Sequence, residues 1–66
     1  MAVRAVWDPD IAHLADDPEF KRKVEAAYAR SHGWSFRVHA RDLGWISFEP
    51  DGDQVYHVYR EKNQAA

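Results

Sequence analysis

DPEFKRKVEAAYARSHGWSFRVHAR, residues 17–41, contains the start of a helix, its end and the start of a strand. Asp17 followed by Pro18 is typical of a helix N-terminus, because Asp accepts hydrogen bonds from free backbone N–H groups and Pro fits the first helical position. Gly33 is typical of the residue that ends a helix. Between them, apolar side chains recur at helical spacing and indicate a buried stripe. These side chains are Phe20, Val24, Ala27 and Tyr28.

After Gly33 the repeat of apolar residues changes from about 3.6 residues, as in a helix, to two residues, which indicates a half-buried strand. Its core side is expected to carry Trp34, Phe36, Val38 and Ala40, and its solvent side Ser35, Arg37, His39 and Arg41. Pro, Gly and Asp mark turns elsewhere in the chain and bound the remaining strands. Further strands are expected at 2–7, 45–49 and 55–61, with turns at 8–10, 42–44 and 50–52.

The chain is therefore predicted to be an α+β domain, with one main helix packed on a small antiparallel sheet in the order β-α-β-β-β. Residues 11–15 are expected to form one irregular helical turn before the main helix. The pattern does not determine which strand lies beside the first one. The predicted core consists of Phe20, Val24, Tyr28, Phe36, Val38, Ile46 and Phe48.

Length and composition restrict the class of protein. Sixty-six residues make a single compact domain, 1–66, in which 62–66 is expected to be a frayed tail. Nine basic and eleven acidic residues give a net charge of −2, which argues against binding by non-specific phosphate contacts. The chain has no cysteine and no apolar run of membrane-spanning length, so a cytoplasmic location is expected. A core this small makes a homodimer possible.

The register of the last hairpin decides which side chains share the outer face of the sheet. A three-residue loop at 50–52 sets Trp45 opposite His57, and the preceding hairpin sets His39 opposite Trp45. A two-residue turn at 51–52 instead buries His57 and Tyr59 and exposes Tyr56 and Arg60. The first register is favoured, and it predicts a binding surface formed by Arg37, His39, Arg41, Trp45, His57 and Tyr59.

Several functions fit such a surface. Trp, Tyr and Arg are enriched at protein-binding hot spots, which favours a non-enzymatic protein-binding module. The expectation includes an inhibitor or regulator of phage or mobile-element type that acts on nucleic-acid-handling machinery. The same face could bind nucleic acid, with Arg37 and Arg41 on phosphates and with Trp45 and Tyr59 stacked on bases. A small ribonuclease that uses His39 and His57, with Arg37 to stabilise the phosphate, is a further alternative. A solvated sheet face with no partner is the plain alternative, and no catalytic residue, metal ligand or cofactor is predicted.

Overall fold

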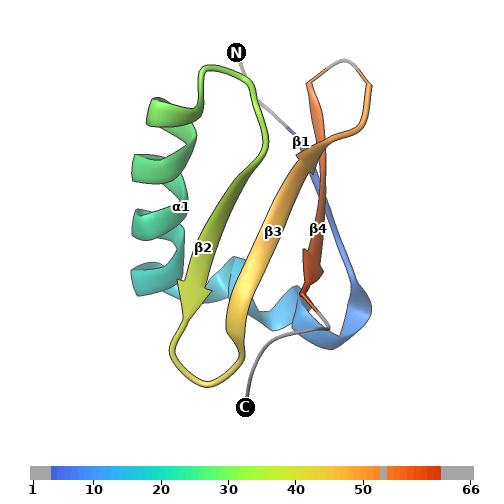
Figure 1. The fold of residues 1–66 in the computed structure, drawn as a ribbon. Coiled ribbons are helices and arrows are strands. Elements are labelled where there is room, and N and C mark those ends of the chain that lie inside the picture. The colour runs from blue at the N-terminus through green and yellow to red at the C-terminus, as the bar shows by residue number, and fades with distance from the viewer. Residues whose placement is uncertain (1–3, 53, 62–66) are drawn as a thin grey trace.

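The computed structural model describes residues 4–52 and 54–61, which form a helix and a 3-10 helix on one side of a four-stranded sheet (Figure 1). The predicted α+β class is confirmed. The elements are β1 (Arg4–Trp7), η1 (Pro9–Asp16), α1 (Pro18–Ser31), β2 (Phe36–Ala40), β3 (Gly44–Pro50) and β4 (Val55–Arg60). The frayed tail expected at 62–66 and the first two residues of the strand expected at 2–7 lie outside the described residues.

The strand order is β1-β4-β3-β2, and the sheet is mixed rather than wholly antiparallel. β2, β3 and β4 form the expected antiparallel meander, whereas β1 pairs with β4 in parallel. The reason is topological. The connection through η1 and α1 brings the chain back to the sheet in its original direction, so β2 is parallel to β1. Two further reversals make β4 parallel to β1 as well, and β4 is the strand that pairs with β1.

The predicted helix boundaries are confirmed. The Asp17 carboxylate accepts hydrogen bonds from the backbone N–H groups of Glu19 at 3.0 Å and Phe20 at 3.3 Å, so Asp17 caps α1. At the other end the left-handed conformation begins at His32, with φ of 53°, and continues at Gly33, with φ of 85°. Gly33 adopts this conformation without the Cβ penalty that other residues meet, and α1 ends at Ser31, just before this left-handed pair.

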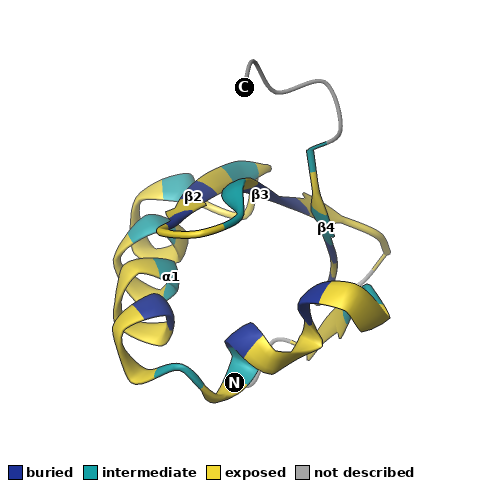
Figure 2. Cartoon of the chain, turned by 90° about the horizontal axis from the view of Figure 1, so that it is seen from below, coloured by how far each residue is buried: buried dark blue, intermediate teal, exposed yellow. Residues whose placement is uncertain are grey.

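The segment expected to form one irregular turn is an eight-residue 3-10 helix that contributes to the core. Ile11 is 1% exposed, and Leu14 is also buried. Figure 2 shows η1 and α1 on the same side of the sheet, with the buried positions of η1 turned toward the strands. Ile11 and Leu14 were not in the predicted core, because three consecutive turns of hydrophobic periodicity are needed to identify a buried helix face and η1 is too short.

Phe20, Val38, Ile46 and Phe48 are buried as predicted, and Val24 and Phe36 pack against this core while partly exposed. Two expectations are wrong: Tyr28 is 41% exposed and Trp34 is 75% exposed. Tyr28 lies near the end of α1, where its ring makes T-shaped contacts with the Phe36 and Tyr56 rings at the margin of the core. Trp34 precedes β2, so no strand pairing holds its side chain against the core.

The predicted pairing of His39 with Trp45 is confirmed, but the predicted register of the last hairpin is wrong. Glu49, rather than Trp45, is opposite His57. The turn lies two residues later than expected, because Asp51 donates its N–H to the Val55 carbonyl at 2.7 Å. Pro50 belongs to β3. In this register its nitrogen points away from β4, and the pairing of β3 with β2 begins only at Phe48, so no strand of the described chain lies on that side of Pro50. The missing N–H of Pro50 therefore removes no hydrogen bond from the sheet.

Because the turn is shifted by two residues, each side chain of β4 stays on the side of the sheet that was predicted for it. Tyr56 and Val58 are buried while His57 is exposed, so the alternative register that buried His57 is also wrong. No helix in the described residues is long and apolar enough to cross a membrane.

Candidate binding surface

The outer face is defined here as the side of the sheet that is turned away from α1 and η1. Strand alternation and the observed register arrange it in three rows. The rows are His39–Trp45–Glu61, Arg37–Ser47–Tyr59 and Glu49–His57–Val6, with Arg4 and Asp8 at the margin. Five of the six residues predicted for the binding surface therefore lie on this face, but the predicted single row of His39, Trp45 and His57 is not formed.

Trp45 lies between two side chains of β2. The Arg37 guanidinium is 4.4 Å from the centroid of the Trp45 ring, and the His39 ring meets Trp45 edge-on with centroids 5.1 Å apart. Arg37 is itself held by a bidentate ion pair with Glu61, at 2.7 and 3.1 Å. Trp45 is 38% exposed, so one part of the ring is fixed by neighbours while another part is available for contact.

Ser47 lies beneath this layer and is buried although its side chain points outward. Its hydroxyl donates a hydrogen bond to Glu61 at 2.6 Å. The hydrogen bonds from Arg37 and then from Ser47 hold the pKa of Glu61 below its ordinary value. Glu61 thus stays ionised and fixes the position of the Arg37 guanidinium over Trp45.

A second group of contacts surrounds Tyr59 and His57. Their rings are 5.4 Å apart, and the His57 Nε2 atom is 3.1 Å from the Asp8 Oδ1 atom. Partial burial raises the pKa of the Tyr59 phenol, and its hydrogen bond with Glu49 acts in the same direction. Tyr59 therefore remains neutral and can donate a hydrogen bond on this face.

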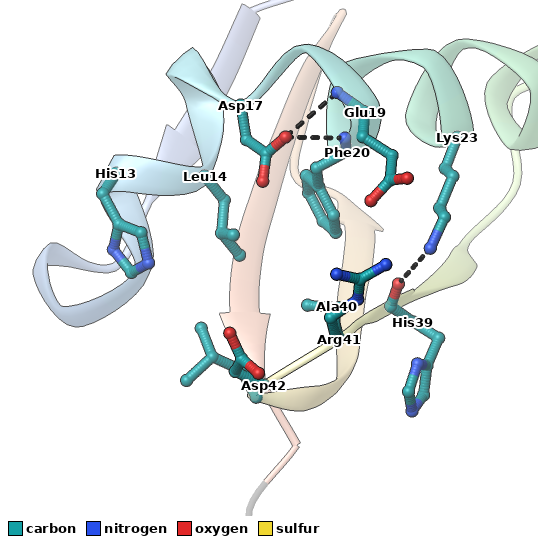
Figure 3. A pocket seen from close by; sticks show the side chains of 11 residues that line it. His13, Leu14, Asp17, Glu19, Phe20, Lys23, His39, Ala40, Arg41 and Asp42 are labelled. Atoms are coloured by element: carbon teal, nitrogen blue, oxygen red, sulfur yellow. Dashed lines mark hydrogen bonds between the residues drawn. The ribbon is translucent and has the colours of Figure 1, made fainter.

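Arg41 does not belong to the outer face, which corrects the prediction. The strand alternation ends at Ala40, where the carbonyl accepts a hydrogen bond from the Leu43 N–H at 3.3 Å and the chain turns. Figure 3 shows the Arg41 side chain directed toward the first turn of α1. There it lines a separate pocket with Glu19 and Lys23.

This pocket lies where η1, the start of α1 and the turn after β2 meet (Figure 3). Sequence reasoning missed it, because its His13, Glu19 and Lys23 come from segments with no shared motif. Its volume is about 160 Å³, below the range of pockets that hold drug-sized ligands. Asp17 is occupied by helix capping, and Lys23 donates to the His39 carbonyl at 3.4 Å. No group of three His, Asp or Glu side chains suited to a metal ion occurs in residues 4–52 and 54–61.

The positions of His39 and His57 bear on the ribonuclease alternative. They lie on β2 and β4, with β3 between them. His39 is opposite Trp45 of β3 and His57 is opposite Glu49 of β3, so the two histidines are offset by four residues along the strands. Standard strand spacing and rise place their Cα atoms roughly 17 Å apart. A general acid and a general base must both reach one phosphodiester, and this separation does not favour the pair for that role.

The charges on the outer face have both signs. Arg4 and Arg37 are the arginines, and Asp8, Glu49 and Glu61 are the carboxylates.

Comparisons with protein-family models, with curated proteins and with solved structures found no match.

Proposed function

We propose that this chain is a non-enzymatic protein-binding module whose contact surface is the outer face, formed by Arg37, His39, Trp45, His57 and Tyr59. The observation that carries the proposal is the fixed Trp45 ring, with Arg37 over it at 4.4 Å and His39 at its edge. Trp and Arg are the side chains most enriched at binding hot spots. Their existing contacts restrict their rotamers, which lowers the entropy lost when a partner binds.

The charge distribution favours a protein partner over nucleic acid. Arg37 is neutralised by Glu61, while Glu49 and Asp8 would face the phosphates of a strand laid across the sheet. Nucleic-acid surfaces normally show an excess of Lys and Arg. Arg41, which was expected to hold a second phosphate, lines the pocket beside α1 instead. A protein surface of mixed charge matches this face better.

For the type of partner, our working hypothesis is nucleic-acid-handling machinery, on which this chain acts as an inhibitor or regulator of phage or mobile-element type. The chain's small size and the wide separation of its outer-face histidines support a role through contact rather than chemistry. Mimicry of nucleic acid by the acidic residues has less support. Asp17 caps α1, and Asp8 is paired with His57, so both carboxylates have local structural roles.

The test compares two tryptophans. Immobilised wild type, Trp45→Ala and Trp34→Ala are used to capture proteins from nuclease-treated lysate of the source cells. Trp34 is a matched control because it is 75% exposed and lies outside the outer face. Trp45→Ala is expected to lose the captured partner, whereas Trp34→Ala keeps it. Both variants should remain folded, since Trp45→Ala removes contacts worth about 1–2 kcal/mol.

Three results would contradict the proposal. Full capture by Trp45→Ala would place the contact elsewhere, and a partner that wild type captures from untreated lysate but not from nuclease-treated lysate would indicate nucleic acid as the ligand. Capture that falls by roughly a thousandfold or more between 50 and 200 mM salt would also indicate phosphate contacts. A Trp45→Ala domain that does not fold would show that Trp45 is structural, and Arg37→Ala then tests the same face with a smaller change in packing.

A further inference from the structure

The sheet has two edges, and only one is covered by the rest of the described chain. α1 lies beside β2, where Lys23 donates to the outward-facing carbonyl of His39. β1 forms the opposite edge, at the far side of the sheet from α1 (Figure 1). A covered edge cannot accept another strand, whereas an open edge presents unpaired backbone donors and acceptors.

The hydrogen bonds of β1 identify which backbone groups are available. Arg4 donates its N–H to the Gln54 carbonyl at 2.9 Å, and Asp8 donates to the Val58 carbonyl at 3.0 Å. Alternation along a parallel ladder then directs the backbone N–H and C=O groups of Arg4, Val6 and Asp8 toward β4. The N–H and C=O groups of Ala5 and Trp7 point to the free edge.

We propose that a second copy of this chain binds at this edge, with the two β1 strands antiparallel about a two-fold axis at Val6. Ala5 of each copy is then opposite Trp7 of the other, and these two pairs form four backbone hydrogen bonds. The resulting sheet has eight strands, within the range of open sheets. Centring the axis on Trp7 instead would bring Ala5 opposite Pro9, which has no N–H to donate.

The side chains of β1 complement one another in this register. On the outer face Arg4 of each copy is opposite Asp8 of the other, which forms two ion pairs across the edge. Val6 is 51% exposed in the single chain and meets its own copy on the axis. Val6 has a positive residue two positions before it and a negative residue two positions after it. A two-fold axis through Val6 therefore brings each charge opposite its complement, as a symmetric dimer interface requires.

The inner side of β1 supports the same partner. An apolar groove of about 320 Å³ lies between α1 and β1, and Ala5 lines it while remaining exposed. The pairing places Trp7 of the second copy opposite Ala5 on this side, so the partner strand borders the groove at its β1 end. The two-fold axis is perpendicular to the sheet, so both outer faces point in the same direction and a dimer presents two binding surfaces together.

Analytical ultracentrifugation of the full chain tests the proposal, together with NMR spectra recorded over the same concentrations. The paired area is small, so we expect a weak dimer with a dissociation constant between roughly 10 µM and 1 mM. The amide signals of Ala5 and Trp7 should move with concentration. Val6→Lys sets two ammonium groups on the axis and should raise the dissociation constant by about tenfold or more.

Ala5→Pro removes two of the four intermolecular hydrogen bonds and should have an effect of about the same size, with no loss in the β1–β4 ladder. Ala29→Lys is the matched control: it adds the same charge to the exposed face of α1 and should leave the dissociation constant unchanged. A monomer at every concentration up to about 1 mM overturns the proposal. So does a dimer that survives Val6→Lys and is abolished by Trp45→Ala, which would show pairing through the outer face.

Discussion

Phe48→Ala is expected to remove most of the stability of this domain. Phe48 is 2% exposed and lies at the centre of an aromatic cluster from four elements. Its ring stacks on Phe36 with centroids 4.7 Å apart and an interplanar angle of 9°, and it contacts Trp7 at 5.8 Å and Phe20 at 6.3 Å. Replacement of a buried Phe by Ala costs about 3–5 kcal/mol. A domain of this length has a total stability of about 3–10 kcal/mol.

Urea unfolding, followed by tryptophan fluorescence and far-ultraviolet circular dichroism, measures the loss. Phe36→Ala is the internal comparison, because Phe36 lies on the same side of the neighbouring strand but is only partly buried. It should cost less, about 1–3 kcal/mol. A loss below about 1.5 kcal/mol for Phe48→Ala, or a larger loss for Phe36→Ala, would show that the core is not centred on β3.

Two further measurements test local features. Asp17→Ala should cost about 1 kcal/mol of unfolding free energy, whereas Asp17→Asn should be nearly neutral because Asn also caps; equal losses in chemical unfolding would refute capping. Glu61 should titrate below its ordinary pKa in NMR experiments, and Arg37→Ala should raise that pKa more than Ser47→Ala. Because folding lowers this pKa, its stabilising contribution is present above the unfolded-state value and is lost as the pH falls through the folded-state value. An unchanged midpoint in Arg37→Ala would refute the ion pair.

The facing of the strands was predictable from the sequence, but their alignment was not. Alternation in 34–40 correctly placed Arg37 and His39 on the outer face, because side chains in a strand point to opposite sides in turn. The row of His39, Trp45 and His57 required the position of the last turn as well. Pro50 suggested that the turn began there, yet it continues β3, since the neighbouring strand β2 does not extend far enough to need its N–H.

The sequence alone determined the features that depend on a few neighbouring residues: the cap at Asp17, the end of the helix at Gly33 and the period-two strand that follows. These depend on backbone conformation and local hydrogen bonds, which are set within one turn or one strand. Only the tertiary structure decided that β1 lies parallel to β4, that η1 contributes to the core and that Arg41 leaves the outer face. Each of these depends on contacts between segments distant in the chain, and no local pattern specifies which distant segment will be the neighbour.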